Sequence, residues 1–285
     1  MLTRSQIDRV VELALAEDAP WGDITSDALI PEGATATAAL VAREPGVLSG
    51  IDVFTAAMTA TGGQVTVTQH LGDGERFPAG ATLAEVTGNA RAVLGAERVA
   101  LNLVQRMSGI ATQTWAFVDA VAGTGARIVD TRKTTPGLRA LERHAVRCGG
   151  GHNHRFSLSD AVMAKDNHLA VLIAGGRDLT EALRDARSRL SHITHLEVEV
   201  DRLDQIAPVL AAGVDTIMLD NFTVDQLRRG VELIAGRAIV EASGTVSLDT
   251  VRAIAETGVD VISIGALTHS VRALDLGLDL AVATA

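Results

Sequence analysis

From about residue 120 onward, short apolar runs alternate with amphipathic stretches of helical spacing. Because strands that are apolar on both faces belong to parallel sheets with helical connections, this alternation predicts an α/β fold. The six expected strands are residues 126–131, 160–166, 194–200, 215–220, 238–243 and 260–265. Six strand–helix units are fewer than the eight of a complete barrel, so an incomplete barrel and an open doubly wound sheet both fit this pattern.

The first part of the chain has a different pattern. Strands are expected at residues 35–43, 63–71 and 81–88, and helices at 4–18 and 51–62. This mixture predicts a separate α+β piece. A long helical segment at 91–125 follows, and we place the domain boundary near residue 110.

Composition narrows the function classes. The net charge of −10 argues against a general nucleic-acid binder, and a 2 % aromatic content argues against base stacking. No apolar run approaches the ~20 residues of a membrane span, and the first residues lack a signal-peptide pattern, so we expect a cytoplasmic protein without a membrane partner. The single cysteine, Cys148, excludes an internal disulfide and any multi-cysteine metal site.

Residues 132–168 form a basic island. They hold seven Arg or Lys and three acids, a balance of +4, and they include the chain's two lysines, Lys133 and Lys165. A basic island in an acidic chain predicts a site for a compact polyanion such as a phosphate or a carboxylate. The alternative, a solvated helix face, fits the part with Arg139, Arg143 and Arg147 at four-residue spacing.

Polar residues follow the expected strands at their carboxyl ends, where α/β sheets place their sites. Ser243-Gly244 and Gly265-Ala266 resemble phosphate-binding turns, although plain turns have the same composition. Glu199 and Asp220 are expected at one mouth, where carboxylates bind ribose hydroxyls or Mg²⁺, or stabilise a cationic transition state. A salt bridge to Lys165 or an arginine is the alternative, and Glu197 lies one layer deeper.

Two further groups leave alternatives open. His152 and His154 suggest a metal, but later strand ends offer no further histidine, so His154 and Arg155 more readily bind an anion. Arg98, Asn102 and Arg106 share one face of an expected helix, which faces either solvent or a partner chain.

Taken together, eight sequence motifs of this chain resemble those of the quinolinate phosphoribosyltransferase family. The resemblance lies in residues 97–112, 130–139, 146–155, 158–168, 196–200, 217–222, 241–251 and 260–270. Several motifs in the right order are far more specific than any one of them. The chain departs from the family's common pattern at Thr245, where a second glycine is usual.

The resemblance implies a fold and a reaction. The fold is an N-terminal α/β sandwich (1–110), an incomplete TIM-like α/β barrel (111–270) and a C-terminal helix (271–285) that returns to the first domain. The enzyme, a pentosyltransferase, transfers the phosphoribosyl group of phosphoribosyl pyrophosphate (PRPP) to quinolinate with decarboxylation in NAD biosynthesis. Mg²⁺ is the implied cofactor, and the implied assembly is a homodimer or a higher homo-oligomer.

The resemblance also implies roles for single residues. Arg132, His154, Arg155 and Lys165 would hold the carboxylates of quinolinate, and Lys133 would meet quinolinate or pyrophosphate. Glu199 and Asp220 would hold the ribose hydroxyls and the metal, which makes them catalytic together with Lys133 and Lys165. Ser243, Gly244, Gly265 and Ala266 would bind the 5-phosphate, and Arg98 would reach the neighbouring subunit's site.

Three competing functions differ in class or substrate. The nearest is a phosphoribosyltransferase for a pyridine monocarboxylate such as nicotinate, against which the abundance of cations argues. A metal-dependent barrel hydrolase would use His152, His154 and the carboxylates. A non-catalytic sensor of a phosphosugar or dicarboxylate is the third, and the pairing of two carboxylates with a phosphate turn argues against it.

Overall fold

The computed structural model describes residues 2–62 and 64–283. The chain divides into two compact units. The first comprises Met1–Trp115, Thr134–Gly150 and Ala266–Ala285, and the second comprises Ala116–Lys133 and Gly151–Gly265. Each is described by itself below.

The first unit contains an antiparallel sheet of four strands in the order β12-β1-β5-β3. Its strands are β1 (Thr35–Ala42), β3 (Thr66–Gln69), β5 (Thr82–Asn89) and β12 (Leu276–Ala283). A small ribbon joins β2 (Gly46–Val47) to β4 (Arg76–Phe77). The three strands predicted before residue 110 are therefore confirmed, as β1, β3 and β5.

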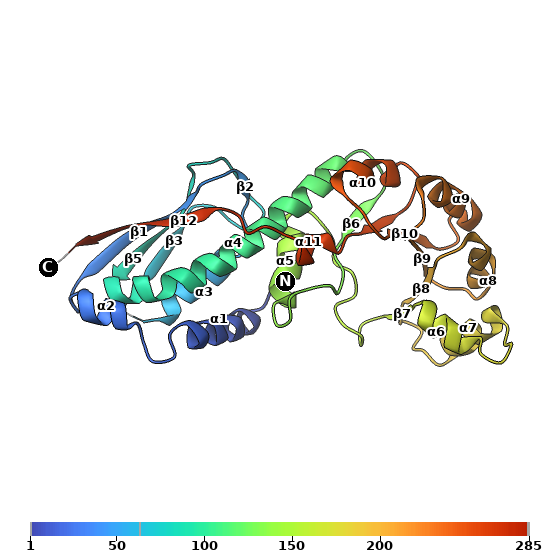
Figure 1. The fold of residues 1–285 in the computed structure, drawn as a ribbon, viewed down its shortest axis with the longest axis horizontal. Helices are drawn as coiled ribbons and strands as arrows, with labels where there is room; N and C mark the ends of the chain where they lie inside the picture. Colours follow the sequence, from blue (N-terminus) through green and yellow to red (C-terminus); the bar gives the residue numbers. More distant parts are fainter. Residues whose placement is uncertain (1, 63, 284–285) are drawn as a thin grey trace. The chain divides into compact units, whose positions relative to one another are not determined.

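Helices α3 and α4 lie against one face of this sheet (Figure 1). The helices of the unit are α1 (Arg4–Asp18), α2 (Ile24–Leu29), α3 (Ile51–Ala60), α4 (Ala90–Ala120), α5 (Arg139–Cys148) and α11 (Ala266–His269); residues 116–120 of α4 belong to the second unit. Leu40, Leu83 and Val86 of the sheet are fully buried and form part of an apolar core. An α/β sandwich is thus the architecture of this unit, as the family resemblance implies.

The prediction of a C-terminal helix is wrong. The segment forms β12, which pairs with β1 from Thr35 opposite Ala283 to Ala42 opposite Leu276. Its apolar residues recur at every second position (Leu276, Leu278, Leu280 and Val282), which is the period of a strand. The strand completes the hydrogen bonds of β1 on the side that β5 leaves open.

The polar face predicted on α4 is only partly a surface. Arg98 and Asn102 are exposed. Arg106 instead turns toward α5, where its Nε and Nη2 donate to Oε1 of the buried Glu142 at 2.9 and 2.6 Å. The buried carboxylate of Glu142 would be strongly destabilising without a charged partner. Arg106 supplies that partner, so its guanidinium is not part of an exposed face.

The second unit is built on six parallel strands in the order β6-β11-β10-β9-β8-β7. They are β6 (Arg127–Val129), β7 (Val162–Ala164), β8 (Leu196–Val200), β9 (Thr216–Asp220), β10 (Ile239–Ser243) and β11 (Val261–Ser263). All six lie within the runs that the sequence predicts.

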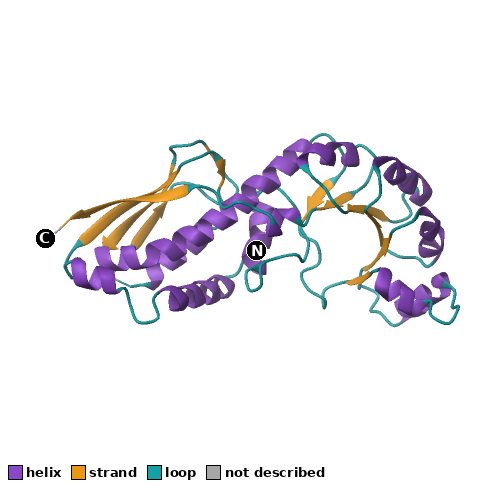
Figure 2. Cartoon of the chain, in the orientation of Figure 1, coloured by secondary structure: helices purple, strands orange, loops and turns teal. Residues whose placement is uncertain are grey.

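Helices connect these strands and cover their outer side, most clearly α8, α9 and α10 (Figures 1 and 2). The helices are α6 (Asp166–Leu172), α7 (Leu179–Ser188), α8 (Ile206–Ala211), preceded by the 3₁₀ turn η1 (Leu203–Gln205), α9 (Val224–Ile234) and α10 (Leu248–Ala255). Asp178 and Thr223 cap α7 and α9 through their side chains, because the first helical amides have no partner within the helix.

The barrel does not close. β6 pairs with β11, whereas β7 pairs with β8, and within the described residues no strand pairing joins β6 to β7. A bridge between Val129 and His152 is the further contact that β6 makes beside this gap. Of the two architectures that the sequence leaves open, the incomplete barrel is therefore correct.

Among the residues that the structure describes, no helix combines the length and the apolar character needed to cross a membrane.

Candidate active site

The carboxyl ends of β8, β9 and β10 bring three predicted site residues to one edge of the sheet. Asp220 and Ser243 are direct partners in the parallel pairing of β9 and β10, and Glu199 pairs with Met218, two residues before Asp220 on β9. Because strand side chains alternate between faces, Glu197 and Glu199 share a face. Glu199 and Asp220 therefore lie near the carboxyl ends of neighbouring strands, as the sequence predicts, and their role as a carboxylate mouth stays a prediction.

Lys165 and Glu199 form an ion pair across this edge. Lys165 follows β7, and its Nζ lies 2.5 Å from Oε2 of Glu199. The lysine side chain is 46 % exposed and the glutamate side chain 13 % exposed, so the pair lies at the boundary between the interior and solvent. The salt bridge considered from the sequence therefore exists, and it leaves the ammonium accessible to an incoming anion.

The turns after β9 and β10 touch closely. Gly244 has a φ of +130°, and a Cβ built on it would lie 2.6 Å from Oδ1 of Asn221. The Asn221 amide donates to the Ser243 carbonyl, and its side-chain Nδ2 donates to Oδ2 of Asp220. Only glycine fits at Gly244, since any side chain would displace Asn221 and with it the carboxylate of Asp220.

A buried cluster lies deeper in the barrel. Nε2 of His154 lies 3.1 Å from Oε2 of Glu197 and 3.5 Å from Oε2 of Glu241, and both glutamates are buried. Oε1 of each glutamate has no hydrogen-bond partner among the described residues. Glu241 is absent from the residues predicted from the sequence, although its position two residues before Ser243, on the same strand face, was a signal that could have found it.

The cluster fixes a proton on His154. Burial acts to lower the pKa of the imidazole, but Glu197 and Glu241 outweigh it and raise the pKa to about 10. For Glu197, burial has the opposite effect and raises the pKa of the carboxyl. The hydrogen bond to His154 lowers this pKa, whereas the charge of Glu241 raises it further. The backbone amide of Arg155 approaches Nδ1 of His154, and this contact alone would favour a neutral ring. The two carboxylates at Nε2 have the stronger effect on the charge of the ring, because charge-assisted hydrogen bonds are stronger than neutral ones.

Asp130 holds the loop that carries His154. It follows β6 and is fully buried, and its two oxygens accept from the His154 amide at 2.8 Å and from Nδ2 of Asn153 at 2.6 Å. A carboxylate with two such donors is fixed in orientation. Asp130 therefore positions the residues that follow it in the basic island.

Two arginines of the basic island repel each other. Burial lowers the pKa of the Arg155 guanidinium below its usual range, and the positive charge of Arg132 lowers it further. Nη1 of Arg155 donates to the Ala161 carbonyl, and Nε of Arg132 is buried without a hydrogen-bond partner among the described residues. Glu197 and Asp160 each act on Arg155 in the opposite direction, but each less than Arg132 does, so the two like charges still favour an anion beside them.

The remaining predicted residues occupy less distinctive positions. Lys133 is exposed, and its amide donates to Oγ1 of Thr131. Gly265 is half-buried just after β11. Ala266 is the first residue of α11 and, like the exposed Arg98 of α4, it belongs to the first unit.

Two groups of side chains have the donor types and spacing of a metal site, namely His154 with Glu197 and Glu241, and Asp73 with His144 and Cys148. The hydrolase alternative requires a metal group that contains both His152 and His154. Within the described residues, no such group of three contains both histidines. Glu199 and Asp220 likewise belong to no group of three among those residues.

Comparisons with known proteins match this architecture. The model of the quinolinate phosphoribosyl transferase C-terminal domain matches residues 110–279, and that of the N-terminal domain matches residues 23–108. The chain belongs to the quinolinate phosphoribosyltransferase family. The resemblance that the sequence motifs indicate is thereby confirmed.

Individual relatives cover nearly the whole chain. The carboxylating nicotinate-nucleotide pyrophosphorylase of Mycobacterium leprae is 46 % identical over 95 % of this chain and 95 % of its own length. A probable enzyme of the same name from Bacillus subtilis is 40 % identical over 96 % of this chain and 93 % of its own length. The solved structure of NadC from Streptococcus pyogenes is 40 % identical with a TM-score of 0.93, covering 100 % of this chain and 99 % of that one.

Proposed function

We propose that the barrel of this chain carries out the reaction of its family, the transfer of the phosphoribosyl group of PRPP to quinolinate in NAD biosynthesis. The products are nicotinate mononucleotide, carbon dioxide and pyrophosphate. The observation that carries the proposal is the meeting of two chemistries in one unit. A pair of mutually repelling arginines follows the first strands, and acidic side chains end the middle strands.

The arginines suit a dianionic substrate. Arg132 and Arg155 bind the carboxylates of quinolinate, because an anion relieves their repulsion and adds charge-assisted hydrogen bonds. Lys165 adds a third cation at the solvent edge. A dicarboxylate uses these charges more fully than nicotinate does, which favours quinolinate over a pyridine monocarboxylate.

His154 takes a role different from the one that the family resemblance implies. Its Nε2 faces Glu197 and Glu241, and its Nδ1 faces the Arg155 amide. We therefore assign it as a positioning residue, whose positive charge offsets the charge of the two buried glutamates.

Glu199 and Asp220 act on the sugar. As pyrophosphate leaves PRPP, the ribose gains the positive charge of an oxocarbenium-like state, and nearby carboxylates stabilise that charge. Hydrogen bonds from the ribose hydroxyls to the same carboxylates hold the anomeric carbon in line with the pyridine nitrogen. After attack, carbon dioxide leaves and its bonding electron pair stays on the adjacent ring carbon, where the quaternary nitrogen stabilises it until a proton from water forms the new C–H bond. The protein's main task is therefore positioning.

Mg²⁺ is the proposed cofactor. Carboxylate oxygens are its preferred protein ligands, and it commonly binds through one or two carboxylates together with substrate phosphates. Glu199 and Asp220 at the barrel mouth fit this donor set, directly or through water. The ion, when bound, neutralises the departing pyrophosphate, with Lys133 as a further cation at that end.

The turns after β10 and β11 suit the 5-phosphate of PRPP. Ser243 and Gly244 follow β10 in the partly exposed turn before α10, and Gly265 and Ala266 follow β11 before α11. Backbone amides and the Ser243 hydroxyl are the donors that a phosphate needs. Thr245, in the place of the family's usual glycine, is exposed and leaves this turn open.

A homodimer or higher homo-oligomer in the cytoplasm is part of the proposal. Arg98 is exposed on α4 and makes no hydrogen bond or ion pair within the described residues. A guanidinium at this position is available to the substrate of a neighbouring subunit. Arg98→Ala is then expected to lower activity without changing the fold of its own subunit.

The test is an incubation of the purified chain with quinolinate, PRPP and Mg²⁺, followed by detection of nicotinate mononucleotide and of labelled carbon dioxide from quinolinate. Nicotinate in place of quinolinate is the substrate control. Product from nicotinate alone would overturn the dicarboxylate assignment. Tightly bound zinc at His154, with no nucleotide product, would favour the hydrolase alternative.

A further inference from the structure

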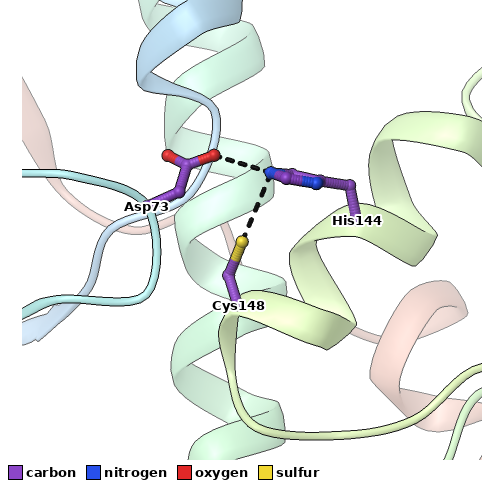
Figure 3. A group of neighbouring side chains, drawn as sticks. All are labelled: Asp73, His144 and Cys148. Atoms are coloured by element: carbon purple, nitrogen blue, oxygen red, sulfur yellow. Dashed lines mark hydrogen bonds and ion pairs between the residues drawn. The ribbon is translucent and has the colours of Figure 1, made fainter. Parts of the chain in front are cut away.

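Three side chains of metal-binding type meet in the first unit (Figure 3). Nε2 of His144 lies 2.6 Å from Oδ2 of Asp73 and 3.4 Å from Sγ of Cys148. The three ligand atoms all lie within 4.8 Å of one another. None of the roles assigned above to the barrel residues involves this group.

Local structure brings two of the three together. His144 and Cys148 are four residues apart on α5, so they lie on the same side of the helix, one turn apart. This spacing on a helix is a common way to present two ligands to one metal ion. Asp73 comes from a distant part of the sequence, the turn that precedes β4.

The Asp73 carboxylate is held in place by contacts outside the cluster. Its Oδ1 accepts from the backbone amides of Gly50 and Ile51, at 2.8 and 3.0 Å, at the start of α3. This leaves Oδ2 directed at His144. Hydrogen bonds that orient a ligating carboxylate from behind are a regular feature of metal sites.

The position of the cluster suits a small cation. The side chains of His144 and Asp73 are 24 % and 21 % exposed, so they are shielded but reachable. Nε2 of His144 is the atom that approaches both of the other ligand atoms, so the three donors surround one small space that a divalent cation could occupy.

We propose that Asp73, His144 and Cys148 form a binding site for a zinc-like divalent cation, with a fourth position open to water. One thiolate, one imidazole and one carboxylate are all ligands of tetrahedral Zn²⁺. A thiolate in the set disfavours Mg²⁺ and Ca²⁺, which prefer oxygen. Binding requires an unprotonated Nε2 on His144 and a thiolate on Cys148, so any protons that these two atoms carry pass to water as the cation enters.

The site would join two segments that are distant in sequence. The turn with Asp73 and the end of α5 already approach closely, since a Cβ on Gly74 would lie 3.5 Å from the Cys148 carbonyl. Ligand atoms of a tetrahedral zinc site are about 3 to 4 Å apart, so side-chain rotations of about 1 Å suffice. The bound cation would then clamp the turn onto the helix.

The experiment is a titration of the full, chelator-treated chain with Co²⁺ alone, followed by displacement with Zn²⁺. We expect one Co²⁺ per chain, with an absorption band from charge transfer between thiolate and cobalt that Zn²⁺ abolishes. Cys148→Ser is expected to lose the band. His144→Ala and Asp73→Asn are expected to weaken binding by more than about tenfold.

His192→Ala is the matched control, because His192 is an exposed histidine in the second unit and should bind Co²⁺ like the wild type. The circular dichroism spectrum of each variant checks its fold. No charge-transfer band in the wild-type chain overturns the proposal, and this result does not depend on any variant folding. A band of equal strength and affinity in His144→Ala also overturns it, because the thiol would then bind alone.

Discussion

The two sheets of the molecule use their buried faces differently. In the antiparallel sheet, β1 buries only apolar side chains, namely Ala36, Ala38, Leu40 and Ala42. In the parallel sheet, β8 buries Leu196, Val198 and Val200 at alternate positions and buries Glu197 between them. The two regions therefore differ in chemistry at positions of equal burial.

Burial of charge has a free-energy cost that burial of a methyl group does not have. An apolar side chain removed from water stabilises the fold, whereas an ionised one must find partners or lose its charge. The barrel keeps Glu197 and Glu241 beside His154 despite this cost. The comparison indicates that the first sheet is shaped mainly by stability and the interior of the barrel by function.

The largest expected effect concerns the charge on His154. Replacement of both Glu197 and Glu241 by Gln removes the two carboxylates that raise its pKa but leaves its burial, so the pKa should fall from about 10 to below 6.5. Nuclear magnetic resonance of the imidazole nitrogens measures this directly. An unchanged pKa would show that the carboxylates do not set the charge.

The same variant tests pH-dependent stability. A pKa raised in the folded state contributes stability that is complete below the unfolded value of about 6.5 and is lost as the pH rises toward the folded value. The free energy of unfolding of the wild type should therefore fall between about pH 6.5 and pH 10. The double variant should show a shallower fall in urea unfolding over the same range.

Leu40→Ala tests the apolar side of the comparison. Leu40 is fully buried in β1, so its truncation should lower the free energy of unfolding by about 2–5 kcal/mol. Urea unfolding measures this loss. The folded fraction should retain its affinity for quinolinate, and a specific loss of affinity at equal folding would contradict the division between the two regions.

Arg155→Ala should reverse that pattern. Loss of one charge-assisted contact, worth about 1.5–3 kcal/mol, should lower kcat/KM for quinolinate about tenfold to a hundredfold. Stability should change less than activity, because relief from the Arg132 charge partly offsets the lost hydrogen bond to Ala161 and the lost attraction to Glu197 and Asp160. Arg189→Ala, on the exposed pair with Asp185, is the control and should leave turnover unchanged. Normal turnover in Arg155→Ala would remove this residue from the site.

The smallest effect compares two glycines. Gly244→Ala should destabilise the chain by about 1–3 kcal/mol, because a Cβ there meets Asn221 and the φ of +130° is strained. Gly95→Ala on α4 meets no atom within 4 Å and should stabilise the helix by about 0.5–1 kcal/mol. Thermal unfolding of both variants checks the difference in sign. Equal shifts would show that the turn after β10 tolerates a side chain.

Much of this fold could be predicted from the sequence. Apolar periodicity located all six barrel strands, and the capping residues Asp178 and Thr223 marked two helix starts. The ends of the strands located Glu199, Asp220 and Ser243, since the carboxyl ends of parallel strands share an edge. These signals are local in sequence, which is why they could be detected.

Contacts between distant residues could not be predicted in the same way. Nothing near Glu142 indicates that Arg106, 36 residues earlier, pairs with it, nor does any local pattern join Asp73 to His144. The C-terminal strand was a different case, because its alternating leucines carried a strand signal that the family resemblance outweighed. Its pairing with β1 depends on the tertiary fold.

That pairing has a consequence for synthesis on the ribosome. Thr35 lies opposite Ala283, so β1 leaves the exit tunnel long before its neighbour β12 exists. Until then one edge of β1 exposes unpaired backbone groups, which are prone to join other chains. The first unit thus reaches its final form only after the barrel strands have been translated. A nascent chain that stalls within the barrel would expose the unpaired edge of β1 to chaperones.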